Sequence, residues 1–280
     1  MTLTFTKMQG LGNDFVVIDG IRQQPGLDAA TVRRLADRRY GIGCDQLLLA
    51  ERTTNPAADF RYRIWNADGG EVEHCGNGVR CMARFLLDQG LASAGPLVLE
   101  TTGGRLTRVT PTADGCMQVD MGAPVLEPAA IPFDAPARAL AYPLTVNGEG
   151  ITIAAVSMGN PHAVLRVDDV DHAPVATLGP AIEHHPAFPN RVNAGFMQVL
   201  ARDRIRLRVH ERAAGETLAC GTGACAAVVA GVLNAWLDAR VTVSLPGGRL
   251  VIDWQGEGRS VLMTGPAQTV FEGRLSTGMA

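Results

Sequence analysis

Two cysteines stand in matching surroundings, and their setting favours acid–base chemistry. The segment Gly70–Gly78 reads GEVEHCGNG and recurs at Gly215–Gly223 as GETLACGTG, 145 residues later. A helical run of apolar residues follows each segment, so we expect both cysteines, Cys75 and Cys220, at helix starts. The positive end of a helix macrodipole favours a thiolate and lowers the pKa of a thiol.

The glycines after each cysteine leave backbone N–H groups free to bind an anion such as a carboxylate. Two thiols on opposite faces of one carbon atom suit inversion of its configuration. One thiolate removes a proton, and the other thiol returns a proton to the opposite face. The carboxylate of the planar intermediate can be stabilised by the two helix N-termini. The sequence therefore predicts racemisation or epimerisation α to a carboxylate, without a metal or cofactor.

The same register relates other elements of the two halves. Alternating apolar and basic residues at 60–64 and 205–209 predict half-buried strands. Gly12-Asn13 and Gly159-Asn160 each precede an apolar run, at an offset of 147. We infer an internal duplication.

The fold class that follows is α+β, with two pseudo-symmetric domains, each a curved mixed sheet around a central helix. We expect the first domain to span residues 1–118 and the second 119–265. The last segment, 266–280, reads as a strand that returns to the first domain. The second central helix is almost wholly apolar, so we expect it to be buried on all sides.

Composition and charge exclude several classes of function. The net charge is −3, with 19% charged residues, and the only basic cluster is Arg33, Arg34, Arg38 and Arg39. We interpret that cluster as a solvated helix face, so no nucleic-acid partner is expected. No apolar stretch approaches the length of a membrane helix. We expect a cytoplasmic protein whose six cysteines are thiols.

The cysteines are also compatible with structural and redox roles. Cys44, Cys81, Cys116 and Cys225 are best explained as structural residues. A redox disulfide between Cys75 and Cys220 is the main competitor to proton transfer. Its formation as an inactivating side reaction is also compatible with the sequence.

Polar residues near the repeated segments are candidates for holding a zwitterion. Asn13 and Asn160 are duplicates, and Gln46 matches Asn193 at the same offset. Glu211-Arg212 replaces Asn66-Ala67, so the halves differ where an asymmetric substrate could be recognised. Arg212 can bind a carboxylate in bidentate fashion, although a surface ion pair is the simpler alternative. His162 is a further candidate because it follows Asn160 closely.

These motifs resemble the diaminopimelate epimerase family. The resemblance runs from about Lys7 to the C-terminal strand and is carried by MQGLGNDF, NADG, CGNG, MGNPH and ERAAGETLACGTG, which start at residues 8, 66, 75, 158 and 211. It implies interconversion of LL- and meso-diaminopimelate without pyridoxal phosphate, in lysine and cell-wall precursor synthesis. It also implies a two-domain fold and a homodimer.

Carried over position by position, the resemblance makes Cys75 and Cys220 the acid–base pair, assisted by His162 and Glu211. It assigns the reacting carboxylate to the backbone N–H groups of Gly76, Asn77, Gly221 and Thr222. The rest of the substrate would contact Asn13, Gln46, Asn66, Asn160, Asn193, Glu211 and Arg212. The chain departs from the family pattern at His74, Ala194-Gly195 and Ala213.

A related two-thiol racemase acting on proline or hydroxyproline is the alternative within enzymes. Arg212 favours diaminopimelate, because a simple cyclic amino acid has no distal carboxylate. A thiol redox or binding module is the alternative outside this class.

Overall fold

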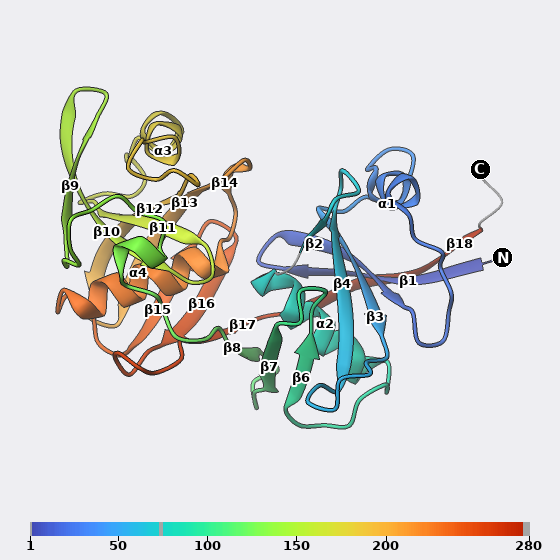
Figure 1. The fold of residues 1–280 in the computed structure, drawn as a ribbon. Coiled ribbons are helices and arrows are strands. Elements are labelled where there is room, and N and C mark those ends of the chain that lie inside the picture. The colour runs from blue at the N-terminus through green and yellow to red at the C-terminus, as the bar shows by residue number, and fades with distance from the viewer. Residues whose placement is uncertain (1, 73–74, 277–280) are drawn as a thin grey trace. The chain divides into compact units, whose positions relative to one another are not determined.

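The computed structural model describes residues 2–72 and 75–276 and divides the chain into two compact units (Figure 1). Unit 1 runs to Val119 and includes the chain from Gly265 onward, and unit 2 is Asp120–Thr264. Both units are strand-rich with two α-helices each, which confirms the predicted α+β class. Among the helices of the described residues, none has the length and apolar composition that a membrane span requires.

Unit 1 wraps strands around α2 (Gly76–Asp88), which packs against β1, β2, β3, β6, β7 and β18. Helix α1 (Ala29–Ala36) packs against β3. The strands of this unit are β1 (Thr2–Gly10), β2 (Asn13–Asp19), β3 (Gln46–Glu51), β4 (Phe60–Asn66), β5 (Glu71–Val72), β6 (Leu97–Glu100), β7 (Leu106–Pro111), β8 (Met117–Asp120) and β18 (Gln268–Ser276).

Unit 2 repeats this plan around α4 (Gly221–Leu233), with α3 (Val175–Glu183) packed against β12 and β13. A short 3₁₀ helix, Pro128–Ala130, precedes its first strand. Its strands are β9 (Tyr142–Val146), β10 (Glu149–Ser157), β11 (Pro161–Arg166), β12 (Asn193–Ala201), β13 (Arg204–Glu211), β14 (Gly215–Thr217), β15 (Arg240–Leu245), β16 (Gly248–Asp253) and β17 (Leu262–Gly265).

Strand pairing follows one pattern in both units. The parallel pair β2–β3 corresponds to β11–β12, and the antiparallel pair β3–β4 corresponds to β12–β13. The parallel pairs β4–β6 and β13–β15 also match. The duplication inferred from the sequence is thus a duplication of topology. Strand β18 pairs antiparallel with β1, from Thr2 opposite Ser276 to Gln9 opposite Gln268.

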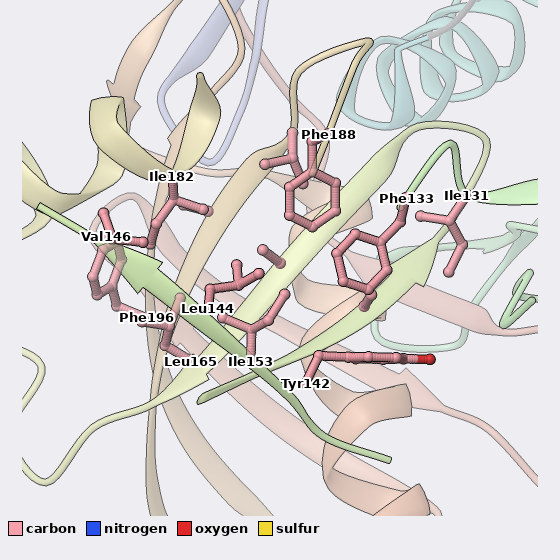
Figure 2. Packing of buried hydrophobic residues seen from close by; sticks show 14 of the residues in the cluster. Ile131, Phe133, Tyr142, Leu144, Val146, Ile153, Leu165, Ile182, Phe188 and Phe196 are labelled. Carbon is pink, nitrogen blue, oxygen red and sulfur yellow. The ribbon is translucent and has the colours of Figure 1, made fainter. Parts of the chain in front are cut away.

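The core of unit 2 includes a cluster between α3 and the sheet (Figure 2). Phe133 stacks on Phe188 at 4.5 Å between ring centroids and meets Tyr142 edge-on at 4.8 Å. The other labelled members of the cluster are Ile131, Leu144, Val146, Ile153, Leu165, Ile182 and Phe196. These contacts fix α3 on its sheet. Helix α4 is buried from Gly221 to Gly231 except at Thr222, as its apolar sequence predicts.

The basic cluster of unit 1 differs from its prediction. Helix α1 ends at Ala36, so only Arg33 and Arg34 lie on the helix. Arg38 is in the following loop, where its guanidinium contacts Asp14 at 2.7 Å and Asp45 at 2.8 Å. The spacing of the four arginines predicts a helix that continues through residue 39. The helix ends earlier because its cap residue, Asp37, has a β-like backbone.

Candidate active site

Cys75 caps the N-terminus of the central helix of unit 1. Its backbone is extended, with φ −145° and ψ 114°, and α2 begins at the next residue. The Gly78 N–H donates to Cys75 Sγ at 3.3 Å. A Cβ at Gly78 would lie 3.5 Å from this sulfur and 3.3 Å from Cys75 Cβ. Glycine at this position therefore lets the first helical turn close tightly on the thiol.

Asn13 links the thiol to its surroundings. Its Oδ1 lies 3.8 Å from Cys75 Sγ and 3.5 Å from Asn77 Nδ2. Its Nδ2 donates to Asp45 Oδ2 at 3.1 Å. Since a carboxylate only accepts hydrogen bonds, Asp45 fixes which way the amide faces. The carbonyl oxygen of Asn13 is thereby directed at the thiol.

Gln46 and Asn66 form a second pair in unit 1. They face each other across β3 and β4, and Gln46 Nε2 donates to Asn66 Oδ1 at 2.8 Å. Gln46 is also the register partner of Phe15 in β2. The two predicted amides are therefore brought together at adjacent strand ends.

Arg80 is a residue near this half-site that sequence reasoning missed. It is fully buried in α2 and donates to Asn77 Oδ1 at 2.9 Å and to the carbonyl oxygen of Gly76 at 3.3 Å. Its Nε also reaches the carbonyl oxygen of Pro266 at 3.2 Å. Arg80 thus braces the first turn of the helix. An arginine inside an apolar helical run was the available signal, because a buried charge needs partners.

Cys220 caps α4 in the same way, with φ −117° and ψ 105°. Its side chain is buried, and Sγ lies 3.6 Å from Thr222 Oγ1. Burial raises the pKa of the Cys220 thiol well above its usual value, and the negative charge of Glu211 adds to this. Contacts with Thr222 and Gly223 act in the opposite direction. The expectation of a lowered pKa is therefore wrong for Cys220, since desolvation outweighs the helix terminus.

His162 is buried in β11 and contacts two of the predicted asparagines. Its Nε2 lies 3.1 Å from Asn160 Oδ1 and 3.5 Å from Asn193 Nδ2. Burial lowers the pKa of His162 to about 3, with a further contribution from the charge of Arg212. The imidazole is therefore neutral at physiological pH. Among the described residues, its buried Nδ1 has no hydrogen-bond partner.

Glu211 and Arg212 follow at the end of β13. Thr217 Oγ1 donates to Glu211 Oε1 at 2.5 Å, and the Arg212 guanidinium donates to the carbonyl oxygen of Asn190 at 2.9 Å. The Arg212 N–H donates to Asn193 Oδ1 at 2.8 Å. The Arg212 N–H is thus tied to Asn193. His162 Nε2 lies within reach of both Asn160 and Asn193, and because one ring nitrogen either donates or accepts, it bonds only one of them at a time.

The other predicted site residues, and the described residues that depart from the family pattern, lie at helix starts, in a strand or in a turn. Gly76 and Gly221 are the first residues of α2 and α4, and Thr222 follows in α4. Ala194-Gly195 are buried in β12, and Ala213 has a left-handed backbone with φ 58°. His74 lies outside the described residues. Across residues 2–72 and 75–276, no group of three His, Cys, Asp or Glu side chains could hold a metal ion.

Solved structures share this fold. A hydroxyproline epimerase from Agrobacterium vitis superposes with a TM-score of 0.70 at 16% identity, covering 99% of this chain and 93% of that one. A protein of the phenazine biosynthesis PhzF family from Bacillus anthracis gives a TM-score of 0.69 at 16% identity, with 99% of each chain covered. At these identities the likeness concerns the fold alone.

Sequence relatives are much closer. A diaminopimelate epimerase from Halorhodospira halophila is 67% identical over 273 residues, which cover 98% of this chain and 95% of the relative. Another from Alkalilimnicola ehrlichii is 65% identical, covering 98% of this chain and 99% of the relative. The family model described as diaminopimelate epimerase matches residues 5–127 and 154–270, which include both capping cysteines. The chain therefore belongs to the diaminopimelate epimerase family.

Proposed function

We propose that the protein interconverts LL- and meso-diaminopimelate by proton transfer between two thiols, in lysine and peptidoglycan precursor synthesis. The observation that carries this proposal is the repeated cap. Each unit places a cysteine at the N-cap of its central helix, with a glycine as the first helical residue. Membership of the family supplies the substrate.

In the proposed reaction, each cysteine is the base in one direction and the acid in the other. The raised pKa of Cys220 makes it a thiol at neutral pH. Cys220 is then ready to donate a proton when Cys75 has removed one. The Gly78 N–H that donates to Cys75 Sγ favours the negatively charged sulfur. Glu211 and His162 would assist the thiols, as the family resemblance implies.

The α-carboxylate of the reacting centre would bind the N–H groups of Gly76, Asn77, Gly221 and Thr222. Such donors stabilise the charge that develops when the α-proton leaves. Arg212 would bind the distal carboxylate, and the amides of Asn13, Gln46, Asn66, Asn160 and Asn193 would orient the substrate. Among the described residues, Gln46 Oε1 is buried without a partner. A substrate ammonium group would satisfy this acceptor.

Isotope exchange tests the reaction directly. LL-diaminopimelate is incubated with the reduced protein in heavy water, and proline is incubated in parallel. We expect deuterium at an α-carbon of diaminopimelate and formation of the meso isomer. Exchange into proline without exchange into diaminopimelate would instead assign the protein to the proline racemases.

Single substitutions test the two thiols. Cys75→Ser and Cys220→Ser should each reduce epimerisation by about 10²–10⁴-fold, because a hydroxyl is a far weaker acid than a thiol. Cys225→Ser is the matched control, since Cys225 is also in α4 but lies five residues beyond the cap. Full activity in either cap variant would contradict the mechanism. Exchange that is absent from the parent as well would favour a redox or binding module.

Cofactor independence and location complete the proposal. Activity should survive dialysis against a chelator and treatment with hydroxylamine, which removes pyridoxal phosphate. All six cysteines lie in the described part of the chain and none forms a disulfide bond there, which suits the reducing cytoplasm. Cell fractionation under native expression tests that location.

A further inference from the structure

The turn that carries Arg212 has an unfavourable backbone. Glu211 ends β13, Gly215 begins β14, and the Ala214 N–H donates to the Glu211 carbonyl oxygen at 3.2 Å. Between them, Ala213 has φ 58°. A residue with a Cβ is disfavoured in this left-handed region by about 1–2 kcal/mol. The turn therefore needs interactions that hold it.

Two successive backbone N–H groups of the turn are held by buried side chains from other elements. The Arg212 N–H donates to Asn193 Oδ1 at 2.8 Å, and the Ala213 N–H donates to Glu183 Oε1 at 3.0 Å. Asn193 begins β12 and Glu183 ends α3. Both acceptors are buried, with side chains at most 5% exposed.

Glu183 is itself fixed by other donors. His210 Nε2 lies 2.8 Å from its Oε2, and the Arg191 guanidinium reaches its Oε1 at 3.5 Å. Burial acts to raise the pKa of Glu183, but the hydrogen bonds from Ala213 and His210 lower it overall. The carboxylate is therefore ionised and accepts on both oxygens.

Helix α3 contacts His210 at a second position, Gly179. A Cβ at Gly179 would lie 2.7 Å from His210 Cβ, so helix and strand are in close contact there. His210 is the residue immediately before Glu211 on β13. The imidazole thus joins the end of α3 to the strand that carries the two candidate substrate contacts.

We propose that Glu183 and His210 are positioning residues, which hold the backbone of 211–213 so that Arg212 and Glu211 face the substrate. This inference rests on the proposed role of Arg212 in binding diaminopimelate. A purely structural role would not require a buried carboxylate, because apolar replacements of buried ion pairs are often as stable. An apolar residue in place of Glu183 would leave the Ala213 N–H without its acceptor, so the carboxylate is needed to hold the turn.

Kinetics of Glu183 variants test the proposal in the full-length protein. Glu183→Ala should raise KM for diaminopimelate by about tenfold, as expected for loss of about 1.4 kcal/mol of binding. Glu183→Gln should restore KM to within about threefold of the parent, since its amide oxygen can still accept from Ala213. Ile182→Val is the control, because it weakens the neighbouring core position without touching the turn.

A double-mutant cycle with Arg212→Ala separates this inference from the proposed site. If Glu183 acts through Arg212, Glu183→Ala should not raise KM further in the Arg212→Ala background. A full effect in that background would overturn the positioning role. An unchanged KM in Arg212→Ala alone would instead overturn the assignment of Arg212.

A second variant keeps the test decisive if Glu183→Ala does not fold. His210→Ala removes one donor to Glu183 and leaves the turn residues unchanged, so it should also raise KM severalfold. A folded Glu183 or His210 variant with a KM within twofold of the parent would overturn the inference.

Discussion

At the scale of residues, the two capping cysteines have unlike surroundings. Cys75 lies beside an amide oxygen of Asn13, whereas Cys220 lies beside a hydroxyl and near the carboxylate of Glu211. Equivalent positions in a duplicated chain have thus acquired different neighbours. An asymmetric substrate with one reacting and one distal centre would be served by this difference.

The buried His162 predicts a pH dependence of stability. Its folded pKa, about 3, is below the value of about 6.5 in an unfolded chain. Above pH 6.5 neither state binds this proton. As pH falls toward 3, the unfolded state binds a proton that the folded state does not, so stability declines by about 1.4 kcal/mol per pH unit.

Urea unfolding between pH 6.5 and 5 measures this slope. A Trp65→Phe background leaves Trp236 and Trp254 to report on unit 2. His162→Gln should flatten the slope. His172→Gln is the control of opposite sign, because a hydrogen bond to Asp169 raises the pKa of His172, which favours the folded state as pH falls. An unchanged slope in His162→Gln would refute a neutral buried imidazole.

At the scale of elements, close packing of α4 determines where the Cys220 thiol lies. Helix α4 is almost wholly buried, and a Cβ at Gly231 would lie 2.2 Å from Leu237 Cδ1. The C-terminal turn of α4 therefore sits directly on the chain that follows it. The backbone of Gly231 is not in the left-handed region, so its conformation alone does not call for glycine. Glycine is required because Leu237 approaches too closely for a side chain.

Gly231→Ala is expected to reduce the free energy of unfolding by about 1–3 kcal/mol, the usual effect of overpacking a core. Gly150→Ala is the control, because an added Cβ there meets no atom within 4 Å. Thermal unfolding followed by circular dichroism compares the two variants. Equal midpoints would show that α4 can shift to accommodate the methyl group.

At the scale of the whole molecule, unit 1 is built from two separate stretches of the chain and unit 2 from one. Unit 2 is continuous, whereas unit 1 is completed by β18 from the end of the chain. Loss of residues 265–276 would leave β1 paired with β2 alone and would remove the Pro266 carbonyl oxygen from Arg80. The two units should therefore differ in their ability to fold as fragments.

We predict that residues 120–264 unfold cooperatively in isolation, whereas residues 2–119 do not. Joining 265–276 through a short linker to the N-terminus of 2–119 should restore folding, since Ser276 lies opposite Thr2. Near-ultraviolet circular dichroism and urea unfolding of the three chains provide the measurement. A cooperative transition in 2–119 alone would contradict the prediction.

We also propose a homodimer, with exposed apolar side chains of β18 as the candidate surface. Val270 is 56% exposed and Phe271 47% exposed, and Phe271 meets the ring of Phe5 edge-on. Val270→Asp should convert the dimer to monomers in sedimentation velocity. The exposed Leu200 lies in unit 2, so Leu200→Asp serves as the control. A parent protein that sediments as a monomer would refute the proposal.

The sequence by itself determined the family, the α+β class, the duplication and the two central helices. Hydrophobic periodicity is a local signal that acts over a few residues, and the duplication is found by matching two such local patterns 145 residues apart. The motifs also identified amide side chains that form hydrogen bonds with one another in the structure, such as Gln46 and Asn66. The helix end before Arg38 was missed, because one capping residue decides it.

Only the tertiary structure decided which side chains hold the predicted ones in place. Asp45 orients Asn13, Arg80 braces Asn77, and Glu183 holds the turn at Ala213. Two of these partners come from elements about 30 residues away, where no periodic pattern connects them. The raised pKa of Cys220 was also inaccessible, because desolvation depends on the packing around the thiol rather than on its place at a helix start.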